Sequence, residues 1–114
     1  WPTVRDRFRI PVIREFYAST EGNAVTINMD NAEGSVGTAV LKLSDNTTLV
    51  HYDVENDAYL RDANGFCERA APGEVGEMLG QIKVTMPFHG YTSREDTEKK
   101  ILRDVFKQGD AYFR

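Results

Sequence analysis

Short stretches in which apolar and polar residues alternate recur along most of the chain. A period of two is typical of strands that bury one face. Pro11 lies inside the first stretch and, because it has no N–H to donate, places the start of that strand at a sheet edge. The pattern predicts strands over residues 9–17, 24–29, 36–43, 49–54 and 74–84. Within residues 36–43, the apolar cluster at 39–41 also fits a helix.

A hairpin is predicted between residues 59 and 67. Asn64-Gly65 lies at its centre, between two short arms that read as extended. Both residues adopt positive φ at low cost, which a tight two-residue turn requires. The dipeptide is therefore the strongest local turn signal in the chain.

One segment near the C-terminus has a helical pattern. Ser93 can cap its first turn, and Glu95 and Asp96 lie where the helix dipole favours carboxylates. The apolar residues that follow fall on one helical face: Ile101, Leu102, Val105 and Phe106. Gly109 then ends the helix. We therefore expect a mainly β fold, barrel-like or sandwich-like, with one helix near the C-terminus.

Composition and charge exclude several classes of protein. The 114 residues carry 14 Lys and Arg against 18 Asp and Glu, a net charge of −4. This balance disfavours a protein that binds nucleic acid or anionic lipid by charge. The length is that of one domain. Apolar runs are far shorter than the roughly 20 residues that cross a bilayer, so we expect no transmembrane segment in this chain.

Cysteine and histidine are too few for a disulfide framework or a zinc site. Cys67 is the single cysteine, and His51 and His89 are far apart in sequence. From the cysteine count we expect a reducing, intracellular compartment. We expect Cys67 to act as a small hydrophobic residue, while a substrate contact stays open for His89. Asp104 and Asp110 fit helix-end or turn positions better than ligand positions.

Residues 16–23 (FYASTEGN) carry the most candidate chemistry. An apolar strand ends here in hydroxyls, a carboxylate and a glycine, and loops at strand ends often bind ligands. Ser19 and Thr20 offer hydroxyls to phosphate oxygens, and Glu21 offers a carboxylate to Mg²⁺. Tyr17 offers a ring to a base, and Gly22 permits close backbone approach. The residues alone leave open a plainer reading, a strand followed by a Ser/Thr turn with a solvated carboxylate.

The same segment resembles the Tyr-Gly-x-Thr-Glu motif of adenylate-forming enzymes. The form is that of the fatty acid transport protein / very-long-chain acyl-CoA synthetase family. Other stretches resemble motifs of this family and follow in its order: residues 49–55 (LVHYDVE), 61–67 (RDANGFC), 73–77 (GEVGE), 87–91 (PFHGY) and 102–113 (LRDVFKQGDAYF). The resemblance covers nearly the whole chain. Its specificity comes from the order of several motifs rather than from any single one.

The resemblance implies a role for each residue of the first motif. In the family, the aromatic residue matching Tyr17 packs on adenine, and residues matching Tyr17, Ala18, Ser19 and Thr20 form the nucleotide-binding segment. The threonine matching Thr20 contacts the phosphate, and the glutamate matching Glu21 binds Mg²⁺, so these two carry the catalytic role. Ala18 stands where the wider superfamily has glycine, a departure that restricts the backbone but leaves the reactive side chains in place.

The resemblance also implies a reaction and its partners. A fatty carboxylate attacks the α-phosphate of ATP, which gives an acyl-adenylate and pyrophosphate, and coenzyme A then displaces AMP. ATP, Mg²⁺ and coenzyme A are the implied cofactors, and a long-chain or very-long-chain fatty acid is the implied substrate. The parent protein is expected to be membrane-associated, at the endoplasmic reticulum, peroxisome, lipid droplet or plasma membrane.

The ends of the sequence suggest an internal fragment of a longer AMP-binding domain. The sequence starts at Trp1 without a Met, shows no Gly-rich phosphate loop, and stops at Arg114, just before the family's Thr-Gly-Asp motif is expected. The fragment divides into residues 1–23 with the nucleotide motif, 24–91 as a β-barrel-like region, and 92–114 as a helix leading to the ribose-binding motif. We expect the isolated chain to be inactive and to self-associate. The alternative is a stand-alone β-rich binding or interaction domain without catalysis.

Overall fold

The computed structural model describes residues 1–18, 20, 23–37, 46–85 and 87–114. The chain forms two compact units. The N-terminal unit consists of Trp1–Ala18 and Val25–Asp45, and the C-terminal unit consists of Ser19–Ala24 and Asn46–Arg114.

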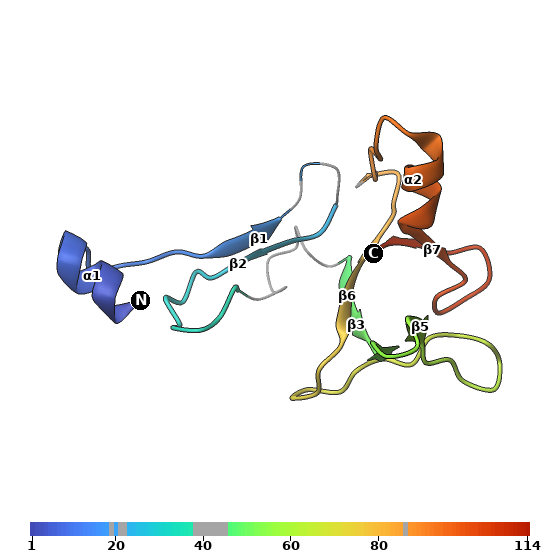
Figure 1. Ribbon diagram of the computed structural model, residues 1–114, viewed down its shortest axis with the longest axis horizontal. Helices are drawn as coiled ribbons and strands as arrows, with labels where there is room; N and C mark the ends of the chain where they lie inside the picture. Colours follow the sequence, from blue (N-terminus) through green and yellow to red (C-terminus); the bar gives the residue numbers. More distant parts are fainter. Residues whose placement is uncertain (19, 21–22, 38–45, 86) are drawn as a thin grey trace. The chain divides into compact units, whose positions relative to one another are not determined.

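The N-terminal unit contains one short helix and a two-stranded ribbon (Figure 1). Helix α1 (Pro2–Phe8) has proline in its first turn, where a missing N–H breaks no helical bond. It ends at Arg9, whose φ of 54° is left-handed. Strand β1 (Phe16–Ala18) pairs antiparallel with β2 (Val25–Ile27). The strand predicted over residues 9–17 therefore begins only at Phe16.

The C-terminal unit is built on a four-stranded antiparallel sheet in the order β3-β6-β8-β7. Its strands are β3 (Thr47–Val50), β6 (Glu77–Gln81), β7 (Ile101–Arg103) and β8 (Ala111–Phe113). Strand β6 pairs with β3 along its length, and its Gly80 and Gln81 also pair with β8. The sheet thus joins segments that are far apart in sequence.

Two smaller elements flank this sheet in the C-terminal unit. Strands β4 (Tyr52–Asp53) and β5 (Ala58–Tyr59) form an antiparallel ribbon. Helix α2 (Arg94–Lys99) starts at Ser93, whose hydroxyl accepts from the Asp96 N–H. The chain does turn back within the hairpin predicted between residues 59 and 67, where the Gly65 N–H donates to the Asp62 carbonyl at 3.0 Å and Arg61 bridges to Cys67. Gly65 has the expected positive φ, 84°, but Asn64 does not, so the expectation of positive φ at both residues was wrong.

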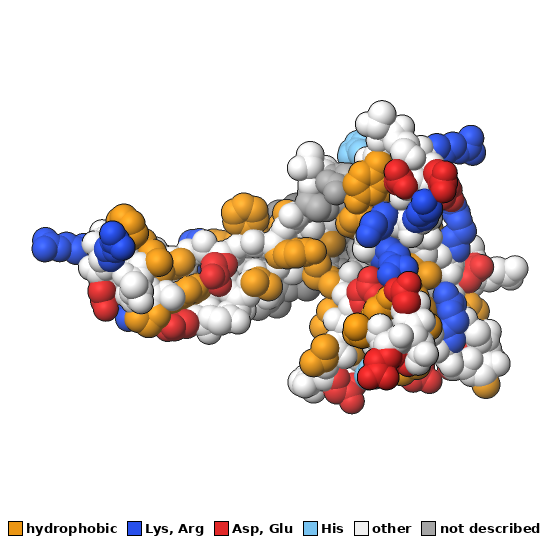
Figure 2. Space-filling view, in the orientation of Figure 1, with side chains coloured by type: hydrophobic (Ala, Val, Ile, Leu, Met, Phe, Trp, Pro, Cys, Tyr) orange, Lys and Arg blue, Asp and Glu red, His pale blue; other side chains and the backbone are white. Residues whose placement is uncertain are grey.

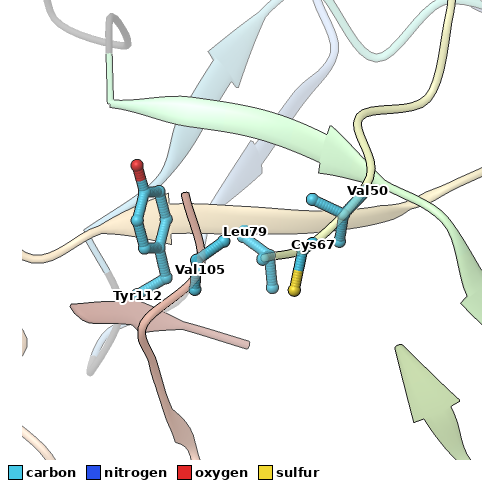
Figure 3. Close-up of a cluster of buried hydrophobic side chains, with 5 residues drawn as sticks. All are labelled: Val50, Cys67, Leu79, Val105 and Tyr112. Carbon is cyan, nitrogen blue, oxygen red and sulfur yellow. The ribbon is translucent and has the colours of Figure 1, made fainter. Parts of the chain in front are cut away.

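The hydrophobic core of the C-terminal unit is small. Val50, Leu79 and Val105 have no exposed surface, and Cys67 and Tyr112 are nearly as deeply buried (Figure 3). Burial of one aliphatic side chain of this size contributes about 1.5–3 kcal/mol. The core therefore depends on strands β3, β6 and β8 together with the loops that carry Cys67 and Val105.

The mainly β fold with a helix toward the C-terminus is confirmed, but the predicted helix was too long. Helix α2 ends at Lys99, and Ile101 and Leu102 lie in β7. Ile101 pairs with Phe113 of β8. The spacing of Ile101, Leu102, Val105 and Phe106 fits one face of a helix. In the structure, the first two lie in β7 and the last two in the loop that follows it, and Leu102, Val105 and Phe106 pack in the same core. Helix α1, which buries no residue, was not predicted.

Two further sequence expectations concern residues 36–43 and the membrane. Residues 38–43 of the predicted strand lie outside the described residues. In the described part of the chain, no helix has the length and apolar character that spanning a membrane requires.

Candidate functional site

Tyr17 and Ala18 lie at the end of β1, in the N-terminal unit. Tyr17 stands opposite Thr26 of β2, and residues directly opposite on antiparallel strands project from the same face. The Tyr17 residue is 53% exposed, and Ala18 is exposed as well. A half-exposed aromatic ring at a strand end is suited to stacking on a planar ligand.

The ribbon that carries Tyr17 is joined to the loop after β2 by a hydrogen bond and a close backbone contact. Thr26 is 7% exposed, and its hydroxyl donates to the Val36 carbonyl at 3.0 Å. Gly37, with a φ of 118°, approaches the Ile27 backbone so closely that a Cβ would lie 2.2 Å from its carbonyl carbon. Only glycine fits this contact. Val36 and Gly37 of this loop therefore pack against β2, the strand that pairs with the one carrying Tyr17.

Thr20 is an exposed bend residue of the C-terminal unit. Its hydroxyl is accessible, as contact with a ligand requires. Ser19 and Glu21 lie outside the described residues, so the roles predicted for them remain predictions. The structure thus places Tyr17 and Ala18 in one unit and Thr20 in the other.

A buried amide network anchors the segment that carries Thr20. The Asn23 side chain donates from Nδ2 to the Gln81 carbonyl at 2.7 Å, and the Asn46 Nδ2 donates to the Asn23 carbonyl at 2.8 Å. The Gln81 N–H in turn donates to the Asn46 carbonyl at 2.7 Å. Asn23 and Asn46 are 7% and 2% exposed. These two asparagines tie the chain at Asn23 to the C-terminal end of β6.

The same anchor requires a glycine at position 80. A Cβ added to Gly80 would lie 2.4 Å from Asn23 Oδ1 and 3.0 Å from the Ala24 Cβ. Sequence reasoning did not assign roles to Asn23, Asn46 or Gly80. The available local signal was a polar residue between Gly22 and Ala24 where a strand begins, and its partners are far away in sequence.

Comparison with curated proteins covers the whole chain. The chain is 46% identical over 116 residues to long-chain fatty acid transport protein 2 of Rattus norvegicus, a match that includes 99% of the chain. It is 36% identical over 113 residues, again 99% of the chain, to the medium/long-chain-fatty-acid–CoA ligase FadD6 of Mycobacterium tuberculosis. It is 39% identical over 127 residues, with the whole chain covered, to the very long-chain fatty acid transport protein of Saccharomyces cerevisiae.

The chain belongs to the fatty acid transport protein / very-long-chain acyl-CoA synthetase family. It spans 19% of the rat protein, 18% of the mycobacterial ligase and 19% of the yeast protein. No family model matches the chain. No solved structure matches it either.

In this member of the fatty acid transport protein family, Cys67 has the placement that its sequence context favours, and the two histidines differ in exposure. Cys67 is buried in the core, and burial raises the pKa of its thiol, which disfavours a reactive thiolate. His51 is partly buried, with Nε2 3.3 Å from a Glu74 carboxylate oxygen. His89 is exposed on the loop before α2, so a substrate contact remains open for it.

A cluster around Arg114 was not anticipated from the sequence. The Arg114 guanidinium carbon lies 5.3 Å from the Tyr59 ring centroid, and its Nε lies 3.6 Å from a Glu77 carboxylate oxygen. Tyr59 also packs edge-on against Tyr52, with ring centroids 5.0 Å apart. Burial, followed by the nearby Glu77 carboxylate, raises the pKa of Tyr59 above its ordinary value. The cluster joins β8, β6 and the β4-β5 ribbon, which indicates a structural role.

The described residues were searched for side chains placed together as metal ligands. Within the described ranges, no group of three or more His, Cys, Asp and Glu side chains is placed to hold an ion. Mg²⁺ is commonly held by one or two carboxylates together with the phosphates of a nucleotide. A single carboxylate such as that predicted for Glu21 is therefore compatible with this kind of site.

Proposed function

We propose that the protein containing this chain is an ATP-dependent ligase that converts long-chain and very-long-chain fatty acids into coenzyme A thioesters. One observation carries the proposal: the chain matches, over 99% of its length, a protein named as a medium/long-chain-fatty-acid–CoA ligase. The matches to fatty acid transport proteins support the same substrate class. Thioester formation traps a fatty acid after entry, which reconciles transport with ligation.

We propose that residues 17–21 form one wall of the ATP site. The exposed ring of Tyr17 suits stacking on adenine, and the exposed hydroxyl of Thr20 suits donation to a phosphate oxygen. Ser19 adds a second hydroxyl, and Ala18 supplies backbone contact. The anchor formed by Asn23 and Asn46 would hold the chain that follows Thr20 to the C-terminal end of β6.

The proposed reaction has two balanced steps. A fatty carboxylate oxygen attacks the α-phosphorus of ATP, and the bond to pyrophosphate breaks. The coenzyme A thiol, losing its proton, then attacks the acyl carbonyl carbon, and AMP leaves. Negative charge develops on phosphate oxygens, so donors that stabilise these oxygens contribute most. Thr20 would donate to such an oxygen throughout the first step.

Glu21 is the proposed ligand for Mg²⁺. When bound, the ion would neutralise phosphate charge and orient the leaving pyrophosphate. The side chain needed is a hard oxygen donor next to the phosphate-binding hydroxyls, and the sequence order of Thr20 and Glu21 supplies it. We further propose that the whole protein works in association with a membrane, as the transport names of its relatives suggest.

Exchange of labelled pyrophosphate into ATP, dependent on fatty acid, tests the first step in the intact protein. Glu21→Ala should lower the exchange rate about 100-fold or more, the scale seen when a transition-state charge partner is removed. Glu33→Ala, which removes an exposed carboxylate from the loop after β2, is the matched control and should retain wild-type exchange. Unchanged exchange in Glu21→Ala removes Glu21 from the site. Absence of exchange in the wild-type protein overturns the proposed function.

A further inference from the structure

The loop that precedes α2 is fastened to the helix by one side chain, Thr97. The Tyr91 N–H donates to the Thr97 hydroxyl oxygen at 2.8 Å. The same hydroxyl lies 2.8 Å from the Ser93 carbonyl oxygen and 3.2 Å from the Tyr91 carbonyl oxygen, and it donates its single hydrogen to one of these two acceptors at a time. Thr97 is partly buried, although the residues around it on α2 are exposed. It therefore closes the loop onto the first turn of the helix.

Gly90 allows the loop to reach Thr97. Its φ of 74° is left-handed, and a Cβ at this position would lie 2.6 Å from Thr97 Cγ2 and 2.9 Å from Thr97 Oγ1. Any other residue at position 90 would be strained in its backbone and would also push the hydroxyl away from the Tyr91 N–H. Gly90 and Thr97 thus form a matched pair.

The other side of the loop packs on the last strand. The Phe88 ring stacks on Phe113 of β8, with centroids 4.6 Å apart and an interplanar angle of 24°. Phe113 pairs with Gly80 of β6, and Gly80 is the residue whose missing side chain makes room for Asn23. A continuous set of contacts therefore leads from Thr97 through β8 to the anchor at Asn23 and Asn46.

We propose that Thr97 is a positioning residue for the anchor that Asn23, three positions after Thr20 in the sequence, and Asn46 form at the C-terminal end of β6. Its hydroxyl fixes the loop, the loop places Phe88 on Phe113, and the β8-β6 pairing sets the position of Asn23. The proposal rests on the proposed function for the identity of the ligand. The structural part stands on its own, because it concerns the hydrogen bond between Thr97 and Tyr91 and its effect on β6.

Substitutions at position 97 separate the hydroxyl from the shape of the side chain. Thr97→Val keeps the branched shape but cannot accept from the Tyr91 N–H, whereas Thr97→Ser keeps the hydroxyl. Thr92→Val is the control, because it removes an exposed threonine hydroxyl five positions away. Phe88→Leu interrupts the stack on Phe113 and leaves the hydroxyl in place, so it tests the path independently.

The experiment measures amide hydrogen exchange and ATP–pyrophosphate exchange in the intact protein. The Tyr91 N–H reports on the loop, and the Gln81 N–H, which bonds to Asn46, reports on the anchor. Thr97→Val should speed exchange of the Tyr91 amide about tenfold, the effect of losing one hydrogen bond, and should speed exchange of the Gln81 amide to a smaller extent. It should also raise the KM for ATP more than it lowers kcat. Phe88→Leu should also speed exchange of the Gln81 amide and raise the KM for ATP. Thr97→Ser and Thr92→Val should resemble the wild type in both measurements.

Two results would overturn the proposal. The first is a Tyr91 amide that exchanges at the wild-type rate in Thr97→Val. The second is a faster Tyr91 amide with an unchanged Gln81 amide and an unchanged KM for ATP, which leaves Thr97 with a local role only. A wild-type protein without ATP–pyrophosphate exchange would overturn the proposed function instead, and the two amides would still decide whether Thr97 positions the anchor.

Discussion

The Asp110 carboxylate accepts a hydrogen bond of 2.6 Å from the backbone N–H of Val105. Its second oxygen accepts from the N–H groups of Phe106 and Lys107 at 3.0 and 3.1 Å. Asp110 is 7% exposed, so these bonds replace most of its contact with water. The loop between β7 and β8 is therefore shaped around one carboxylate, and this shape delivers Val105 to the core.

Replacing Asp110 should destabilise the C-terminal unit. In Asp110→Asn, an NH₂ group replaces one acceptor oxygen, and at least one of the three N–H groups loses its partner. Hydrogen bonds to charged groups contribute about 1.5–3 kcal/mol each, so we expect a loss of about 2–4 kcal/mol in the free energy of unfolding. Urea denaturation followed by tyrosine fluorescence would measure it. Asp30→Asn, at an exposed position of the N-terminal unit, is the control, and equal stability of the two variants would contradict the prediction.

The local part of the fold could be predicted from the sequence. The turn at Asn64-Gly65 and the start of α2 at Ser93 each depend on the conformational preferences of neighbouring residues. The end of α2 could not be predicted, because Ile101 and Leu102 have the same spacing on a helix face as on a strand followed by a loop. The pairing of β7 with β8, a contact over some ten residues, decides between them.

The candidate site divides in the same way. The strand-end position of Tyr17 could be predicted, but its exposure does not follow from alternation, because all three residues of β1 are exposed. The anchor could not be predicted, because Asn23, Asn46 and Gln81 are brought together only by the pairing of distant segments. A buried asparagine has the same sequence appearance as a loop asparagine, so nothing local distinguishes them.

Removing the anchor should loosen the nucleotide-binding segment. Asn46→Asp replaces the Nδ2 donor with an oxygen that faces the carbonyls of Asn23 and Gln81. Because this leaves a buried carboxylate beside two acceptors, we expect a loss of about 2–4 kcal/mol in stability. In the intact protein, the KM for ATP should also rise. Asn31→Asp is the matched control, because Asn31 is exposed and its side-chain oxygen accepts from the Ile13 N–H, a role that aspartate retains. A wild-type KM for ATP together with lowered stability would contradict the prediction, because it would show that the anchor stabilises the fold without affecting nucleotide binding.

The hairpin between residues 61 and 67 should weaken in acid. Hydrogen bonds from the backbone, that of Phe66 foremost and that of Asn64 as well, lower the pKa of Asp62 below its ordinary value. A group whose folded pKa is depressed stabilises the fold above its unfolded pKa and loses this contribution as the pH falls through the folded value. Chemical shifts of the Gly65 amide should therefore change below about pH 4. Asp62→Asn, which keeps an acceptor but does not titrate, should remove this change, and an identical acid transition in the variant would contradict the assignment.

The isolated 114-residue chain should self-associate through its N-terminal unit. All the buried hydrophobic residues of the described chain belong to the C-terminal unit, whereas Phe8 and Phe16 are 65% and 72% exposed. Figure 2 shows hydrophobic side chains along the visible face of the N-terminal unit. Exposed apolar surface of this kind favours association. Sedimentation velocity should show oligomers that the double variant Phe8→Ser, Phe16→Ser reduces. Val75→Ser, which removes an apolar residue that is 94% exposed in the other unit, should leave the oligomers unchanged. A wild-type chain that sediments as a single monomeric species and unfolds cooperatively would contradict the prediction.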